Sequence, residues 1–276
     1  MFKPTWCPGC GNFGIWQALQ DAFSELKIEP HQAVLVYGIG CHGNMANWLP
    51  ITAFEGLHGR TLPVASGIKM ISPGLTVLAI AGDGDCYGEG TNHFLHAARR
   101  NLDLTLLVHN NQVYALTTGQ TSPSSNKGFK TKSTPTGTLE LALNPLSISI
   151  AAGASFVARG FGGDIPHLTD LIIKAIKHRG FSVVDILQPC ITFNQVNTFD
   201  WFGERIYKLE EENFKPTSKL VALEKSLEWP QNGIDGKIPI GIFYEEEREI
   251  SEKLVISNWK LGKKENMLKN LLKEFL

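Results

Sequence analysis

The sequence Gly-Asp-Gly-Asp at residues 82–85 ends one apolar segment, 76–81, and Asn-Asn at residues 110–111 follows another, 104–108. Short apolar segments bounded by glycine and polar residues predict buried strands. Two such strands would bring the polar side chains that follow them to neighbouring tips, where their oxygen atoms can meet at one cation. Magnesium prefers oxygen ligands and usually shares its coordination shell with phosphate oxygens. We therefore predict an α/β fold that holds magnesium and a diphosphate at this edge.

The spacing between the two motifs separates this interpretation from other phosphate-binding signatures. This segment has neither the Gly-Lys-Ser or Gly-Lys-Thr of a Walker loop nor a Gly-x-Gly-x-x-Gly dinucleotide fingerprint. Residues 85–109 supply a spacer of 25 residues, and the whole pattern resembles the thiamine diphosphate signature. The resemblance implies that Asp83, Asn111 and the main-chain carbonyl of Val113 bind Mg2+. The alternative is a glycine-rich turn followed by an unrelated asparagine pair.

Length and composition are compatible with one main α/β domain and an appendage. The chain has 276 residues and is 43% hydrophobic, which is enough to bury a sizeable core. We expect a mostly parallel sheet with helices on both faces, in the thiamine diphosphate-binding fold. The predicted main domain covers residues 1–190, and residues 191–276 form a small C-terminal lobe. Apolar residues at helical intervals from residue 266 onward predict that this lobe ends in an amphipathic helix.

Charge and hydropathy exclude several classes of partner. The formal net charge is -1, which argues against a broad nucleic-acid-binding surface. The uninterrupted apolar runs are much shorter than the roughly 20 residues that span a bilayer. The first ten residues show no basic segment followed by an apolar one, so no secretory signal is recognised. We expect a cytoplasmic protein that binds neither nucleic acid nor a membrane.

The cysteines form a second pattern. Cys7 and Cys10 belong to a Cys-Pro-Gly-Cys turn, while Cys41 and Cys190 each follow a predicted strand. In a reducing cytosol a Cys-x-x-Cys pair is more often a metal or redox site than a structural disulfide. Solitary cysteines can complete four thiolates around zinc or a [4Fe-4S] cluster. The absence of a second close pair favours the cluster, but zinc stays open on spacing alone.

Both patterns occur together in one family. The chain resembles the β subunit of 2-oxoacid:ferredoxin oxidoreductases from about residue 5 to residue 250. The motifs that carry this resemblance are Trp6-Cys7-Pro8-Gly9-Cys10-Gly11, Gly38-Ile39-Gly40-Cys41, His58-Gly59-Arg60, Gly82-Asp83-Gly84-Asp85, Asn110-Asn111 and Gln188-Pro189-Cys190.

The resemblance implies roles for individual residues. A [4Fe-4S] cluster would be bound by Cys7, Cys10, Cys41 and Cys190. Catalytic side chains would be those of His42, His58 and Arg60. Contacts to thiamine diphosphate would come from Ile39, Gly40, Cys41, His42, Gly84, Asp85, Ala115 and Leu116.

The resemblance also implies an activity and partners. We expect oxidative decarboxylation of a 2-oxoacid such as pyruvate or 2-oxoglutarate. Coenzyme A would receive the acyl group, and electrons would pass through the cluster to ferredoxin. An α subunit would complete the active site, so that this chain is active only in a heterodimer. The competing hypotheses are a non-oxidative thiamine diphosphate enzyme of the decarboxylase or transketolase type, and a zinc-stabilised scaffold protein.

Three features leave the substrate and some roles open. Some members of the family with broad specificity have a lysine shortly after the third cluster cysteine, where this chain has Asn44, which cannot form an ion pair with a second substrate carboxylate. The polar segment 117–138 is longer than ordinary loops, and we expect it to border the active site or a partner. Cys86 lies inside the diphosphate segment, where a buried structural thiol is the simpler interpretation.

Overall fold

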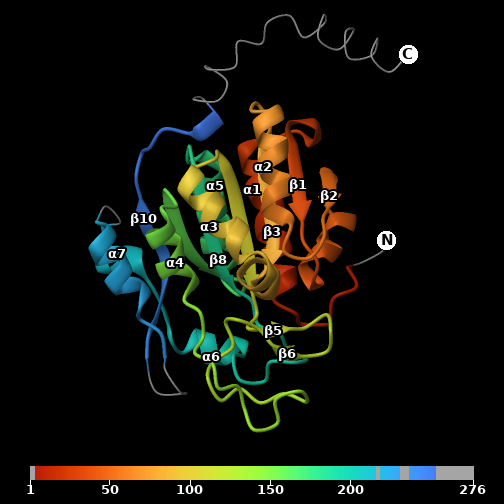
Figure 1. The fold of residues 1–276 in the computed structure, drawn as a ribbon, viewed down its shortest axis with the longest axis vertical. Coiled ribbons are helices and arrows are strands. Elements are labelled where there is room, and N and C mark those ends of the chain that lie inside the picture. Colours follow the sequence, from red (N-terminus) through yellow and green to blue (C-terminus); the bar gives the residue numbers. More distant parts are fainter. Residues whose placement is uncertain (1–3, 216–217, 231–235, 253–276) are drawn as a thin grey trace, which may run out of the picture.

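The computed structural model describes residues 4–215, 218–230 and 236–252. Its strands are β1 (Ala33–Tyr37), β2 (Thr52–Glu55), β3 (Thr76–Gly82), β4 (Leu104–Asn110), β5 (Val113–Tyr114), β6 (Gln120–Thr121), β7 (Phe156–Phe161), β8 (Phe181–Leu187), β9 (Ile206–Lys208) and β10 (Ile238–Glu245). Eight of them form one sheet in the order β2-β1-β3-β4-β8-β7-β10-β9. Its pairs are parallel except for β10 with β7, and β5 and β6 form a separate hairpin (Figure 1).

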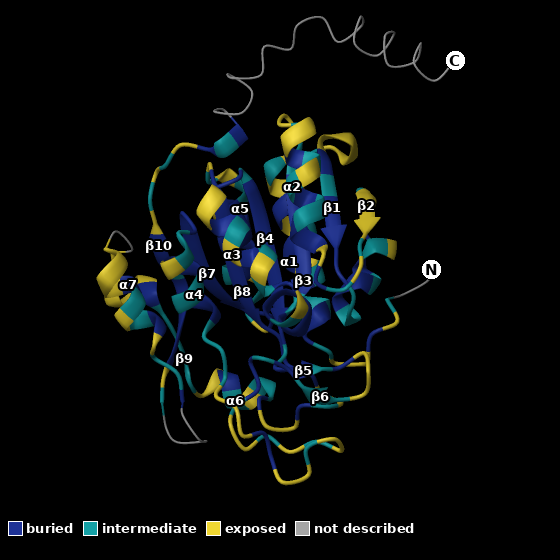
Figure 2. Ribbon diagram, in the orientation of Figure 1, coloured by how far each residue is buried: buried dark blue, intermediate teal, exposed yellow. Residues whose placement is uncertain are grey.

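The centre of the sheet is buried on both faces. Every residue of β4 and β8 is buried, as expected for strands of a parallel sheet that helices cover on both sides (Figure 2). Alternate residues of β3 belong to different cores: Val77 and Ala79 pack on one face, and Leu78 and Ile80 on the other. The continuous apolar runs in the sequence therefore reflect two hydrophobic layers.

Helices form the two outer layers. They are α1 (Asn12–Leu26), α2 (Thr61–Ile71), α3 (Thr91–Arg100), α4 (Pro145–Ala152), α5 (Ile165–Lys177), α6 (Phe199–Gly203) and α7 (Lys219–Ser226). Buried side chains of α1 and α5 share one core, and those of α2, α3, α4 and α7 share the other. Short 3-10 helices cover Pro30–Gln32, Cys41–Asn47 and Leu209–Glu212, and a π-helix covers Gly84–Glu89.

The predicted fold class is confirmed: the sheet is mostly parallel, with helices on both faces. The segment after residue 190 adds β9 and β10 to this same sheet, and the proposed division of the chain at residue 190 stays a prediction. The helix expected from residue 266 lies outside the described residues. In the part of the chain that the structure describes, no helix has the length and apolar character needed to cross a bilayer.

Candidate active site

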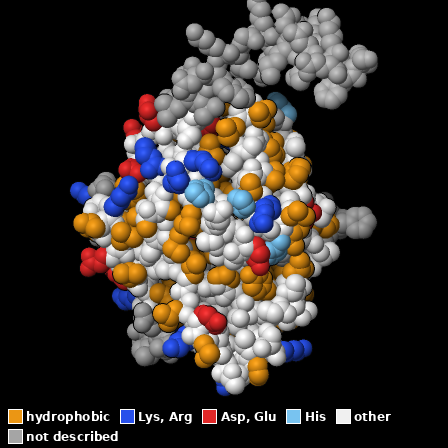
Figure 3. All heavy atoms as spheres, viewed as in Figure 1, with side chains coloured by type: hydrophobic (Ala, Val, Ile, Leu, Met, Phe, Trp, Pro, Cys, Tyr) orange, Lys and Arg blue, Asp and Glu red, His pale blue; other side chains and the backbone are white. Residues whose placement is uncertain are grey.

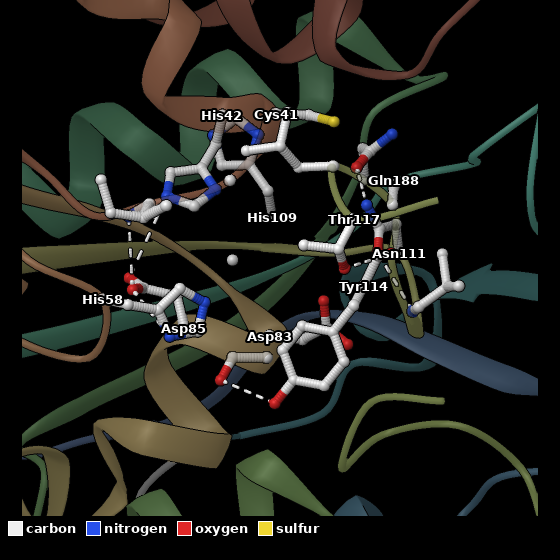
Figure 4. A pocket seen from close by; sticks show the side chains of 17 residues that line it. Cys41, His42, His58, Asp83, Asp85, His109, Asn111, Tyr114, Thr117 and Gln188 are labelled. Atoms are coloured by element: carbon white, nitrogen blue, oxygen red, sulfur yellow. Dashed lines mark hydrogen bonds and ion pairs between the residues drawn. The ribbon is translucent and has the colours of Figure 1, made fainter. Parts of the chain in front are cut away.

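The loops at the carboxyl ends of β1, β3 and β4 enclose a cavity of about 70 Å3, the first cavity (Figure 4). Open α/β sheets place ligands at this edge because the strand ends converge there. Asp83, Asn111 and Val113, the predicted magnesium residues, all line the cavity. All of the predicted cofactor contacts and His58 line it as well. The structure therefore brings these sequence-predicted residues to one place.

Asp83 is a buried carboxyl group held by two serines. It follows β3 and is 2% exposed. The hydroxyl groups of Ser122 and Ser124 each lie 2.5 Å from its Oδ2. Burial raises the pKa of Asp83 to about 6, although the serine hydrogen bonds oppose this shift. A nearby cation would favour the ionised form and offset the cost of burial.

Asn111 is oriented by contacts on both sides of its amide. Its Nδ2 donates to Gln188 Oε1 at 3.0 Å, and its Oδ1 accepts a hydrogen bond from the Val113 main-chain N–H at 3.1 Å. Figure 4 shows Gln188 beside Asn111 on the cavity wall. The backbone of Gln112 has a φ of 58°, which is uncommon for a residue other than glycine. This turn places both Asn111 and Val113 on the cavity.

Asp85 joins three segments that are distant in the sequence. Its carboxyl group accepts hydrogen bonds from Gly59 N–H at 2.7 Å, from Thr61 Oγ1 at 3.0 Å and from Ile39 N–H at 3.4 Å. A Cβ atom on Gly38 would overlap this carboxyl group, so a residue without a side chain is needed there. Asp85 therefore fixes the loop after β1 against the start of α2.

Two histidines lie buried beside the cavity. The rings of His42 and His109 are 5.8 Å apart, and Nε2 of each has no hydrogen-bond partner among the described residues. Burial lowers the pKa of His42 to about 4, partly offset by the Asp85 carboxylate. Burial also lowers the pKa of His109 well below its usual range. Both rings are therefore neutral near pH 7.

His58 and Arg60 differ in position. His58 lines the cavity, and its Nδ1 lies 3.0 Å from Glu89 Oε2. Arg60 is exposed and is absent from the cavity wall. Its Nη1 donates to the carbonyl groups of Gly59 and Glu89 at 3.2 and 3.3 Å. The structure therefore places His58, but not Arg60, against the site.

The four predicted cluster cysteines line a second cavity, of about 460 Å3. Cys7 and Cys10 come from the N-terminal turn, Cys41 from the loop after β1, and Cys190 from the loop after β8. Burial raises the pKa of Cys10 to about 12 and that of Cys41 to about 11, and the neighbouring cysteines add to both shifts. Cys86, by contrast, is buried and lines neither cavity.

The comparisons with known proteins agree with this geometry. Residues 38–186 match the C-terminal TPP-binding domain of thiamine pyrophosphate enzymes, and residues 190–257 match the C-terminal part of the pyruvate ferredoxin oxidoreductase beta subunit. The 2-oxoacid:ferredoxin oxidoreductase subunit beta of Saccharolobus solfataricus is 46% identical over 254 residues, covering 88% of this chain and 82% of that protein.

This chain belongs to the 2-oxoacid:ferredoxin oxidoreductase β-subunit family.

Other members of the family are also similar to this chain over most of its length. The 2-oxoglutarate synthase subunit KorB of Archaeoglobus fulgidus is 39% identical, with 78% of each chain covered. The solved 2-oxoglutarate:ferredoxin oxidoreductase from Magnetococcus marinus, with 2-oxoglutarate, coenzyme A and succinyl-CoA bound, superimposes with a TM-score of 0.89 at 33% identity. This match covers 98% of this chain and 92% of that one. The chain is thus a subunit of a thiamine pyrophosphate-dependent oxidoreductase.

Several residues of this family member's site were missed from the sequence. Ser122 and Ser124 lie in the polar segment 117–138, which was expected only to border the site. Tyr114 and Gln188 also line the first cavity. Tyr114 could have been predicted to line the cavity, because it precedes the predicted contact Ala115 in the sequence. No motif near Ser122 and Ser124 indicated that they contact Asp83.

Proposed function

We propose that this chain is the β subunit of a cytoplasmic enzyme that decarboxylates a 2-oxoacid oxidatively, with thiamine diphosphate, Mg2+ and one [4Fe-4S] cluster. The observation that carries this proposal is the common wall of the two cavities. Gly40, Cys41, Asn111, Ala115, Leu116 and Gln188 line both of them. A cofactor in the first cavity would therefore lie one layer of residues from a redox centre in the second.

The donor set of the first cavity fits a magnesium diphosphate. Its wall carries the carboxyl group of Asp83, the amide of Asn111 and the carbonyl of Val113, all oxygen donors of the kind that Mg2+ prefers. Among the described residues, no lysine or arginine lines it. The negative charge of a diphosphate bound there would therefore be compensated by Mg2+ instead of by a basic side chain.

The size of the first cavity supports a shared active site. About 70 Å3 is smaller than the ~150 Å3 engineered cavity that takes up a benzene molecule. The diphosphate end of the cofactor fits such a space, and the remainder needs another surface. Leu116 lines both cavities and is 57% exposed, so this wall is open to a partner. We assign that surface to the α subunit.

The second cavity suits a cluster better than one zinc ion. Zinc requires four ligands at about 2.0 to 2.3 Å from one point. Within the described ranges, no three His, Cys, Asp or Glu side chains converge closely enough to hold a single ion. The four cysteines are instead among the residues that line a cavity of about 460 Å3. Four thiolates around a polynuclear centre match this arrangement.

The side chains around the first cavity have separate tasks. When bound, thiamine diphosphate supplies the carbon nucleophile and electron sink that loss of CO2 requires. His42 is neutral, so its unpartnered Nε2 can exchange a proton with substrate. His58, paired with Glu89 at the cavity wall, can donate a hydrogen bond to a developing oxyanion. We place Arg60 at the approach to this site, where it would attract an anionic substrate.

The substrate class follows from the second cavity. Asn44 lines it, but its amide already donates to Thr5 and accepts from Trp48. An amide held in this way offers no charge to a second substrate carboxylate. We therefore propose a preference for pyruvate and other monocarboxylate 2-oxoacids over 2-oxoglutarate, with coenzyme A as the acyl acceptor and ferredoxin as the electron acceptor.

Part of the exposed surface of the described chain is apolar. Figure 3 shows apolar side chains spread over the face of the molecule seen in Figure 1. Exposed large apolar residues of the described chain include Phe54, Leu57 and Leu139. Such side chains are typical of surfaces that a stable partner covers.

The test is an anaerobic purification of the chain co-expressed with its α subunit. We expect bound iron, sulfide and thiamine diphosphate, and reduction of a dye acceptor that depends on both a 2-oxoacid and coenzyme A. Cys190→Ser should abolish dye reduction, while Cys86→Ala, which changes a cysteine outside both cavities, should retain it. If the unaltered complex and Cys190→Ser release CO2 from the 2-oxoacid at equal rates, with neither reducing the dye, a non-oxidative thiamine diphosphate enzyme becomes the better assignment.

A further inference from the structure

A third cavity, of about 470 Å3, lies beyond the carboxyl end of β4. It shares no lining residue with the first two cavities. Its wall combines the end of β4, the segment before α4 and the segment after α7, with Arg159 of β7. Small-molecule sites usually measure about 300 to 1,000 Å3. The cavity is therefore large enough for an organic ligand of its own.

The charged side chains that line the third cavity are all positive. Arg159 and Lys127 line the cavity, and no aspartate or glutamate of the described chain does. The first cavity, by contrast, has Asp83 and Asp85 in its wall and neither lysine nor arginine among its described lining residues. An anion would thus be attracted to the third cavity without a metal ion.

Arg159 is a buried cation that is only partly compensated. It is 2% exposed, and its Nε donates to Asp185 Oδ2 at 3.3 Å. Its guanidinium carbon lies 5.1 Å from the ring centre of Trp229 and 5.7 Å from that of Phe243. Asp185 also accepts hydrogen bonds from other side chains, those of Tyr87 and Asn110. Nη1 of Arg159 has no partner among the residues that the structure describes.

The rest of the wall is apolar with a few oriented polar groups. Leu141, Leu143, Leu227 and Trp229 supply the apolar part. Gln112 donates from Nε2 to the Ser124 carbonyl at 3.0 Å, while its buried Oε1 has no partner in the described chain. A mostly apolar wall with a few fixed polar groups is typical of ligand sites. The ligand should therefore have an apolar body and one anionic end.

We propose that the third cavity binds a small organic monocarboxylate, with its carboxylate between Arg159 and Lys127 and its apolar body against Trp229 and the leucines. A guanidinium offers several N–H donors in a fixed fork and is therefore well suited to bind a carboxylate. The site is separate from the decarboxylation proposed above and does not depend on it.

The test uses 4-methylpentanoate as the probe and the co-expressed complex as the protein, with binding followed by titration calorimetry. We expect saturable binding, at least about tenfold weaker for the neutral 4-methylpentanamide, because a charge-assisted contact is lost. Lys127→Gln should weaken binding severalfold. Lys130→Gln is the matched control, since Lys130 is exposed and does not line the cavity, and it should leave binding unchanged.

Arg159→Gln removes the buried cation and should abolish binding of the acid. Because this change leaves Asp185 without a cation, Ala142→Phe is a second variant that fills the cavity without touching that pair. It should also prevent binding while dye reduction continues. Equal affinity for acid and amide, unaltered binding in Ala142→Phe, or no binding by the unaltered complex would each overturn the proposal and leave a cavity filled by water.

Discussion

The two cavities of the proposed active site are built in different ways. The wall of the first is fixed by the chain itself, because Asp83 and Asp85 accept hydrogen bonds from other segments and Asn111 donates one to Gln188. In the wall of the second, the cysteine sulfur atoms take part in few hydrogen bonds among the described residues, such as the 3.4 Å approach of Gln188 Nε2 to Cys10 Sγ. We infer that hydrogen bonds within the chain organise the first site before its ligand binds, whereas the second site relies more on its ligand to fix the sulfur positions.

The largest expected effect tests the cysteine cavity. Cys41→Ser should eliminate bound iron and acceptor reduction, because one of four thiolates is lost. The same change should alter the stability of the iron-free protein by less than about 1 kcal/mol, since serine is close to cysteine in size and Cys41 is only partly buried. Iron analysis and urea unfolding measure the two effects. A large loss of stability in the iron-free protein would show that the two cavities do not differ as described.

The next effect concerns Asp85 in the first cavity. Asp85→Ala leaves the N–H groups of Gly59 and Ile39 and the hydroxyl of Thr61 without their acceptor. Each unsatisfied buried donor costs about 1 to 3 kcal/mol, so we expect a loss of about 3 kcal/mol or more. Urea unfolding of the variant measures it. Thr61→Val removes only one of these bonds and should cost about 1 kcal/mol; equal losses for both variants would contradict the central role of Asp85.

The pH dependence of stability should also come from the first cavity. His42 and His109 have pKa values lowered in the folded protein, so the unfolded chain binds protons first as the pH falls below about 6.5. Stability from these groups is present above that pH and is lost toward pH 4. For His42 alone the loss at pH 5 is roughly 2 kcal/mol.

The raised pKa of Asp83 opposes this trend. Its value of about 6 means that the folded protein takes up this proton before the unfolded chain does, which adds stability as the pH falls below 6. Two histidines against one aspartate still leave a net loss on acidification. Urea midpoints between pH 7.5 and 5 test this, and His42→Asn should give a shallower decline than the unaltered protein. If both proteins lose the same stability between pH 7.5 and 5, His42 does not cause the pH dependence.

The smallest effect is expected from a change in the polar segment 117–138. Ser124→Ala removes a hydrogen bond from Asp83 and one from Asn110. We expect a loss of about 1 to 2 kcal/mol in stability and weaker retention of thiamine diphosphate. Ser133→Ala is the control, because that serine is exposed and its hydroxyl contacts only Thr131 among the described residues. If the two variants retain thiamine diphosphate equally well, Ser124 contributes to stability but not to cofactor binding.

The fold class, the central strands and most of the residues around the first cavity could be predicted from the sequence. Asp83 and Asn111 could be predicted to meet because each follows a buried strand, and parallel strands end at one edge of the sheet. The four cysteines could be grouped because few residue types bind a cluster. Local patterns of this kind survive in the sequence as composition and spacing.

The distant side chains that complete these sites can be recognised only in the folded chain. Ser122 and Ser124 reach Asp83 across about 40 positions of the sequence. Arg60 lies two residues after His58, a residue of the cavity wall, but outside the cavity in space. Arg159 meets the rings of Trp229 and Phe243 only in the folded chain. Such contacts depend on how the loops cross the ends of the sheet. The path of a loop leaves no periodic pattern in the sequence, so these contacts cannot be predicted from it.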